Sequence, residues 1–147
     1  MRTWTILLLA VLALLLGACG TPEEGTNGEK SEGGNEGEMA ATLVKSDLGY
    51  RYTLKNGTNE AVTFNFTSSQ RFDFALYNEA DEQVFLHSSV SAYAQVLGEE
   101  TAPAGGELVY ELEVPPLELE PGTYKIEAWF TPQQGPAYPA ENEYVVE

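Results

Sequence analysis

Apolar and polar side chains alternate along most of the chain between residues 50 and 130. An alternation with a period of two places one face of a strand against a core and the other face in water. The alternating runs cover residues 50–54, 62–66, 72–76, 108–114 and 124–130, and we expect a last strand around residues 143–146. The pattern therefore predicts several short antiparallel strands.

Residues that favour turns separate these runs. Asn-Gly-Thr-Asn stands at 56–59, Glu-Ala-Asp-Glu at 79–82, Gly-Gly at 105–106 and Glu-Pro-Gly at 120–122. Glycine, proline and asparagine adopt or preset the backbone angles that tight turns need. Because no stretch of this region shows a sustained helical period, the strands and turns together predict an all-β fold, an immunoglobulin-like antiparallel β-sandwich.

One tyrosine supports the immunoglobulin-like arrangement. Tyr124 closely follows Pro121 and Gly122 at the head of a predicted strand. Immunoglobulin-like folds place a tyrosine at this kind of corner, with its hydroxyl bound to backbone a few residues upstream. We therefore expect Tyr124 to be a structural corner residue.

A polar segment interrupts the alternation between two of the strands, in the stretch Phe-Thr-Ser-Ser-Gln-Arg-Phe-Asp-Phe at 66–74. If both flanking strands point aromatic rings into one core, the chain turns a corner where backbone groups lose their ladder partners. Hydroxyl, amide and carboxylate groups can supply those partners. We therefore expect Ser68, Gln70 and Asp73 to be structural corner residues, not ligand-binding or catalytic ones.

The first nineteen residues follow different rules. Arg2 precedes an apolar run from Trp4 to Leu16, and the motif Leu-Gly-Ala-Cys ends at Cys19. The run is shorter than the roughly 20 residues of a membrane-spanning helix, so residues 1–18 are typical of a signal peptide for export. The motif resembles the bacterial lipobox, which implies that Cys19 carries diacylglycerol and begins the mature protein.

An acidic segment rich in glycine and glutamate follows the lipobox. Residues 19–39 hold too few apolar side chains to offset the entropy of ordering, so we expect a disordered tether. A folded domain is then expected at residues 40–147. Two acyl chains anchor a protein stably, so we expect the chain on the extracytoplasmic face of the cell membrane, attached through the lipid anchor only.

The predicted domain is strongly acidic. Residues 40–147 contain seventeen Asp and Glu and five Lys and Arg, which gives a formal net charge of 5 − 17 = −12. Such a surface repels the phosphates of nucleic acids. We therefore expect no nucleic-acid partner.

Three spaced motifs in the domain resemble those of a known family. They are Ser68-x-Gln70-x-Phe72-Asp73-Phe74, Tyr93-x-Gln95 and Leu119-x-Pro121-Gly122-x-Tyr124. This set is similar to the bacterial intracellular proteinase inhibitor family, the BsuPI domain, over about residues 48–130. The resemblance implies a small immunoglobulin-like β-sandwich that inhibits a subtilisin-type serine protease. The chain departs from the family in its predicted export and in His87, where the family often keeps an aromatic residue.

The sequence contains no motif that points to catalysis or to a metal. His87 is the only histidine and Cys19 the only cysteine, so a zinc site lacks its usual ligands. Ser88 and Ser89 adjoin His87 in sequence, but the members of a catalytic triad come from separate elements. We therefore expect no enzyme activity, no metal and no cofactor.

Two functions are compatible with these sequence features. In the first, the protein is a membrane-tethered extracytoplasmic inhibitor of a subtilisin-type serine protease. In the alternative, it is a non-inhibitory immunoglobulin-like adhesion or assembly module of the cell surface, because a fold does not by itself determine a function.

The proline-rich segment at residues 131–139 is the candidate inhibitory loop. An inhibitor that presents a substrate-like segment must keep it stiff, and proline restricts the backbone without a disulfide. We expect Pro136, Ala137, Tyr138 and Pro139 to form this loop, with Tyr138 as the aromatic anchor in a hydrophobic specificity pocket. The other interpretation is a stiff connection between two strands.

Overall fold

The computed structural model describes residues 37–147, which form an all-β fold with antiparallel pairing. The strands are β1 (Met39–Ser46), β2 (Gly49–Asn56), β3 (Val62–Phe66), β4 (Phe72–Tyr77), β5 (Gln83–Leu86), β6 (Gly98–Ala102), β7 (Glu107–Leu112), β8 (Gly122–Phe130) and β9 (Ala137–Val146), with a short 3-10 turn, η1 (His87–Ser89), after β5. Within these residues, no helix is long and apolar enough to span a membrane. The predicted signal peptide, Cys19 and most of the predicted tether lie outside the described residues.

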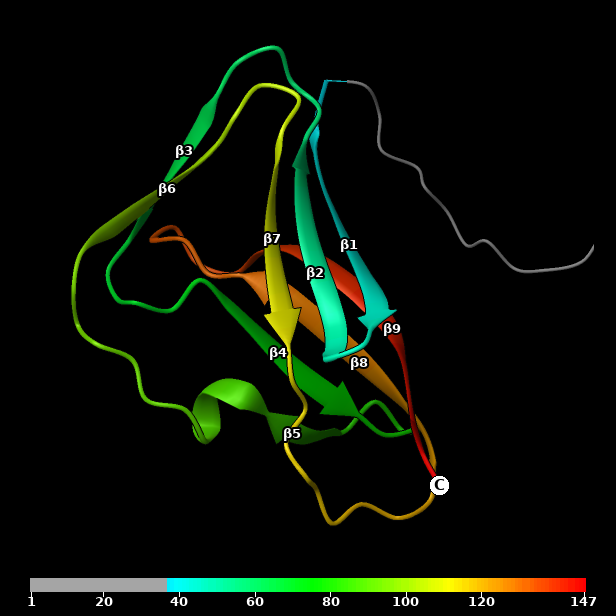
Figure 1. Ribbon diagram of the computed structural model, residues 1–147. Helices are drawn as coiled ribbons and strands as arrows, with labels where there is room; N and C mark the ends of the chain where they lie inside the picture. Colours follow the sequence, from blue (N-terminus) through cyan, green and yellow to red (C-terminus); the bar gives the residue numbers. More distant parts are fainter. Residues whose placement is uncertain (1–36) are drawn as a thin grey trace, which may run out of the picture. The chain divides into compact units, whose positions relative to one another are not determined.

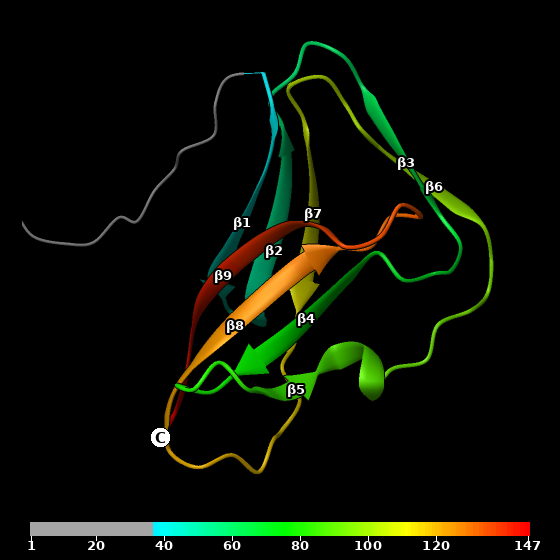
Figure 2. The ribbon, with the colours of Figure 1, turned by 180° about the vertical axis from the view of Figure 1, so that it is seen from behind.

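Two sheets face each other across the core (Figures 1 and 2). The first sheet has the strand order β1-β2-β7, and the second has the order β5-β4-β8-β9. This arrangement confirms the predicted antiparallel β-sandwich and is consistent with an immunoglobulin-like fold. The predicted strands correspond to β2, β3, β4, β7, β8 and β9, whereas β1, β5 and β6 were not predicted.

The strands β3 and β6 form a separate two-stranded ladder that continues from β2 and β7. The Asn56 backbone N–H donates to the Gly106 carbonyl oxygen at 2.9 Å, and the Gly105 N–H donates to the Thr58 carbonyl oxygen at 3.1 Å. These bonds connect the two ladders where the strands are interrupted. In Figure 1 the β3–β6 ladder diverges from the first sheet.

The buried side chain of Asn56 reinforces this junction. Its amide nitrogen donates to three carbonyl oxygens, those of Glu60 at 2.8 Å and of Ala102 and Pro103 at 3.0 Å each. Its oxygen accepts from the Thr58 N–H at 3.0 Å and from the Thr58 hydroxyl at 2.7 Å. Because Asn56 has no exposed surface, these partners replace water for the whole side chain.

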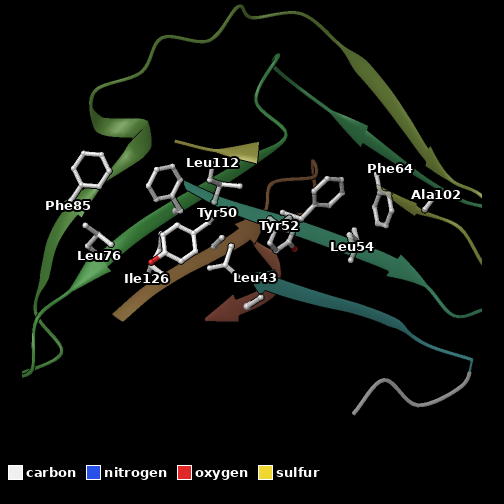
Figure 3. Close-up of a cluster of buried hydrophobic side chains, with 14 of the residues drawn as sticks. Leu43, Tyr50, Tyr52, Leu54, Phe64, Leu76, Phe85, Ala102, Leu112 and Ile126 are labelled. Atoms are coloured by element: carbon white, nitrogen blue, oxygen red, sulfur yellow. The ribbon is translucent and has the colours of Figure 1, made fainter. Parts of the chain in front are cut away.

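The hydrophobic core lies between the two sheets (Figure 3). Its largest fully buried side chains are Tyr52, Phe66, Phe74, Phe130, Leu54, Leu76, Leu112 and Ile126. The Phe130 ring packs edge-on against Phe64 at 4.9 Å and Phe66 at 5.3 Å, so β8 contacts the β3–β6 ladder. Across the core, the Tyr52 hydroxyl donates to the Tyr138 carbonyl oxygen at 2.6 Å and connects β2 to β9.

Candidate functional site

The polar segment between β3 and β4 supplies hydrogen-bond partners to its own backbone. The Ser68 hydroxyl accepts from the Gln70 N–H at 3.2 Å, and the Gln70 side-chain amide donates to the Phe72 carbonyl oxygen at 3.2 Å. Such local bonds replace the ladder partners that a strand loses at a corner. At the second corner, the Tyr124 hydroxyl donates to the Glu120 carbonyl oxygen at 2.8 Å, which is the geometry of a tyrosine corner.

Asp73 connects β4 to η1. Its Oδ1 accepts from the Phe74 N–H at 2.9 Å and from the Ser88 N–H at 3.0 Å. The residue is only 6% exposed, so little water is available to replace this oxygen. The carboxylate therefore satisfies two backbone N–H groups at the start of the second sheet, and its structural role stays a prediction.

We expect Asp73→Ala to lower the free energy of unfolding by about 1–3 kcal/mol, because it removes the acceptor of two backbone N–H groups away from water. Urea unfolding followed by circular dichroism would measure the loss. Asp47→Ala, in the exposed turn between β1 and β2, is the control and should stay within about 0.5 kcal/mol of the parent. An equal loss in both variants would contradict the structural role of Asp73.

A hollow of about 650 Å³ is lined by outer-face residues of the four-stranded sheet and by the segment that leads into β9. It brings Gln70 and Asp73 of the corner together with Pro136, Ala137 and Pro139 of the predicted loop. Its lining also includes Tyr77, Glu127 and Trp129. The corner and the predicted loop, which lie far apart in the sequence, therefore share one surface.

Two carboxylates face each other beside this hollow. Glu127 of β8 lies directly opposite Glu141 of β9 in the ladder. Burial is the main cause that raises the pKa of Glu127, the hydrogen bond and charge of Glu141 raise it further, and Lys125 lowers it. A carboxyl group with a raised pKa holds its proton more tightly in the folded state. Its contribution to stability is therefore present at low pH and is lost as the pH rises through the raised pKa.

We expect Glu141→Gln to increase the free energy of unfolding at neutral pH by about 0.2–1 kcal/mol, because the like charge that it removes directly opposite Glu127 outweighs the long, exposed ion pair of Glu141 with Lys125 at 3.7 Å. The gain should grow as the pH rises from about 4 to about 7, since a glutamate side chain normally ionises at the lower end of this range. Thermal unfolding at several pH values would measure it. Glu118→Gln removes the same charge from an exposed position and is the control; a pH-independent gain in both variants would contradict the pairing.

The structure divides the predicted inhibitory loop between a turn and β9. Pro136 precedes β9, and Ala137, Tyr138 and Pro139 are the first three residues of the strand. Pro136 and Pro139 are exposed, whereas Tyr138 is half-buried, with its ring edge-on to Phe64 at 6.1 Å and its φ at 54°. The anchor role of Tyr138 stays a prediction, and insertion of its ring into a protease would have to break this packing.

A second exposed segment, residues 90–97, connects η1 to β6 along the outside of the fold (Figure 1). It forms no helix or strand. Val90 is 67% exposed, Val96 53% and Leu97 85%, which makes Leu97 the most exposed large hydrophobic side chain in the part of the chain that the structure describes. From sequence, only Tyr93 and Gln95 stand out in this segment, because the run alternates too weakly to predict an element.

The beginning of this segment contacts the side chain of His87, which packs on an aromatic ring of the core. His87, directly after β5, stacks on Phe74 with a centroid distance of 4.7 Å. The Ser91 hydroxyl lies 3.2 Å from His87 Nε2. His87 therefore has a packing role at the end of the strand.

Arg71 lies between the polar corner and the end of the exposed segment. Its Nε donates to Glu100 Oε1 at 2.9 Å, and its Nη1 donates to the Ser68 carbonyl oxygen at 2.8 Å. The guanidinium carbon lies 4.2 Å from the centroid of the Phe66 ring. The other oxygen of Glu100 accepts from the Tyr110 hydroxyl, and burial followed by this bond raises the pKa of Tyr110. The phenol therefore stays protonated and keeps Glu100 in place.

The fold and a comparison with known families define the class of protein. The model of the BsuPI family, described as intracellular proteinase inhibitor, matches residues 36–135. The β-sandwich is thus a proteinase inhibitor domain. Because the match covers more than half of the chain, the protein belongs to the BsuPI family of intracellular proteinase inhibitors. No curated protein matches the chain.

The family assignment corrects the predicted location. We expected the extracytoplasmic face of the cell membrane, but the family is described as intracellular, which points to the cytoplasm. That prediction depended on the apolar run before Cys19, which lies outside the described residues. The family assignment depends on the folded domain. Lipidation of Cys19 stays a prediction from sequence.

Proposed function

We propose that the domain inhibits a subtilisin-type serine protease by occupying its active site. The observation that carries this proposal is the family match over residues 36–135, since a proteinase inhibitor implies a protease as its partner. The resemblance of the three sequence motifs supports the subtilisin type. The exposed segments at residues 90–97 and 133–139 offer two places where the chain could reach a protease cleft.

Inhibition requires a segment that fits the cleft and stays in it. A stiff segment loses little conformational entropy on binding, and its escape after cleavage is slow. Both exposed segments are held by hydrogen bonds to the body of the domain. The Gln133 N–H donates to the Asn65 carbonyl oxygen at 2.7 Å, and the Ser69 N–H donates to the Ala94 carbonyl oxygen at 2.9 Å.

Titration of purified subtilisin with the purified chain tests this proposal. We expect hydrolysis of a chromogenic peptide to fall in proportion to added inhibitor and to end near one inhibitor molecule per protease molecule. Trypsin, which requires a basic side chain in its pocket, is the control protease. Full subtilisin activity beside an intact domain would contradict inhibition and favour the assembly-module alternative.

A further inference from the structure

We propose that residues 90–97 are the segment that enters the protease active site, with the Leu97 side chain in an apolar specificity pocket. This inference rests on the proposed function, because it names the contact through which the inhibitor acts. It assigns the partner a cleft that accepts a large aliphatic side chain.

Exposure is the first argument. Val96 and Leu97 are adjacent, both apolar, and 53% and 85% exposed. Neighbouring exposed apolar side chains on a small domain mark an interaction surface more often than a scattered single one does. They belong to the irregular segment between η1 and β6, which runs along the outside of the fold (Figure 2), where a protease cleft can approach.

The upstream end of the segment is fixed by Ser69. The Ser69 N–H donates to the Ala94 carbonyl oxygen at 2.9 Å, and the Ala94 N–H donates to the Ser69 hydroxyl at 3.0 Å. The Val96 N–H also donates to the Ala94 carbonyl oxygen at 3.0 Å, which forms a tight turn directly before Leu97. The backbone is therefore fixed as far as Val96, the residue before Leu97.

The downstream end is fixed by β3 and by Arg71. Gly98 is the first residue of β6 and lies opposite Phe66 in the ladder. The Arg71 guanidinium lies directly against it, because a Cβ atom at Gly98 would come within 2.5 Å of Arg71 Nη2. Arg71 also forms the ion pair with Glu100. The chain is therefore held again from the residue that follows Leu97.

Ser69 and Arg71 both belong to the short corner at residues 68–71. The exposed residues Val96 and Leu97 therefore connect two fixed points of the backbone. If a protease hydrolyses the Leu97–Gly98 bond, water adds across it and leaves a carboxylate on Leu97 and an amine on Gly98. Both new ends would remain attached to the corner through Ser69 and Arg71. Their high effective concentration slows product release and favours re-formation of the bond. This property distinguishes an inhibitor from a substrate.

The predicted loop at residues 136–139 has weaker support as the segment that contacts the protease. The ring of Tyr138 packs on Phe64, so it is not free to enter a pocket. In addition, Pro136–Pro139 lie beyond the matched residues 36–135, whereas residues 90–97 lie within them. A protease contact that the family shares is therefore expected in residues 90–97.

Exchange of the side chain at position 97 tests the inference. Leu97→Ala should weaken inhibition of subtilisin by about 30- to 1000-fold, the effect of removing an interface anchor. Leu97→Lys should weaken it as well and should create inhibition of trypsin, whose pocket binds basic side chains. Leu48, in the turn between β1 and β2, is 67% exposed. Leu48→Ala and Leu48→Lys are the matched controls and should change inhibition less than threefold.

The outcomes separate the inference from the proposed function. If the parent chain inhibits subtilisin and both Leu97 variants inhibit it within threefold, the inference is wrong and the proposed function stands. If the parent chain does not inhibit, both are wrong. Cleavage of the Leu97→Lys variant by trypsin without inhibition would also overturn the inference, because exposure alone makes a substrate. On long incubation with subtilisin, mass spectrometry should find the first cut within the folded domain, residues 40–147, after Leu97, and a first cut elsewhere in the domain would count against the inference.

Discussion

Asn56→Ala is expected to lower the free energy of unfolding by at least about 3 kcal/mol, because each buried polar group left without a partner costs about 1–3 kcal/mol. The substitution removes a donor that serves three carbonyl oxygens and an acceptor that serves two groups of Thr58. It also leaves a void beside the junction of the two ladders. Asn56 and Ala102 have no exposed surface, so water cannot restore the bond to the Ala102 carbonyl oxygen.

Urea unfolding monitored by tryptophan fluorescence would measure this loss. Asn78→Ala is the matched control, because the Asn78 oxygen also accepts two backbone N–H groups, from Ala80 at 2.9 Å and Glu82 at 3.0 Å, but in an exposed turn. Water can replace these bonds, so the control should lose less than about half as much. Equal losses would mean that burial does not determine the cost.

Phe130→Ala is expected to lower the free energy of unfolding by about 3–5 kcal/mol, the usual cost of a cavity left by a buried phenylalanine. The ring is fully buried, packs on Phe64 and Phe66, and lies 6.0 Å from Tyr110. It therefore contacts β3 and β7 from β8. No smaller side chain at this position maintains all of these contacts.

Thermal and urea unfolding of Phe130→Ala and Phe130→Leu would measure how much of the lost stability comes from the cavity. The leucine variant retains most of the volume and should lose less than about 1.5 kcal/mol. If the two variants lost the same stability, the edge-on ring contacts would matter more than the filled volume. Both Asn56 and Phe130 attach the β3–β6 ladder to the sandwich, so we expect their loss to loosen the downstream anchor of residues 90–97 as well.

The strands with a clear alternation were predictable from sequence. Runs such as 50–54 and 124–130 place an apolar side chain at every second position, and burial follows that alternation in β2 and β8. The polar corner could also be interpreted, since hydroxyl and carboxylate side chains bind backbone groups wherever a ladder ends. These are local properties that the sequence contains.

The remaining elements depend on partners far away in the chain. The strand β6, Gly-Glu-Glu-Thr-Ala, is mostly polar and is defined by its backbone pairing with β3. Apart from the Tyr93-x-Gln95 motif, residues 90–97 carry no local signal for a structural element; Ser69 contacts Ala94 within them, and Arg71 contacts Gly98 directly after them, from far away in the chain. The sequence also does not show that the ring of Tyr138, the predicted anchor, packs on Phe64 of another strand. Contacts between residues so far apart in the sequence can be seen only in the three-dimensional structure.

The corner from Ser68 to Arg71 binds Ala94 through two hydrogen bonds of Ser69, and just after Leu97 its Arg71 side chain lies against Gly98 and pairs with Glu100. Sulfur takes no part, since Cys19 is the only cysteine of the chain. Disulfides persist in oxidising compartments and are reduced by the thiols of the cytoplasm. The proposed inhibitory segment is therefore insensitive to the redox potential around it, and it keeps its shape where a disulfide-bonded loop would open.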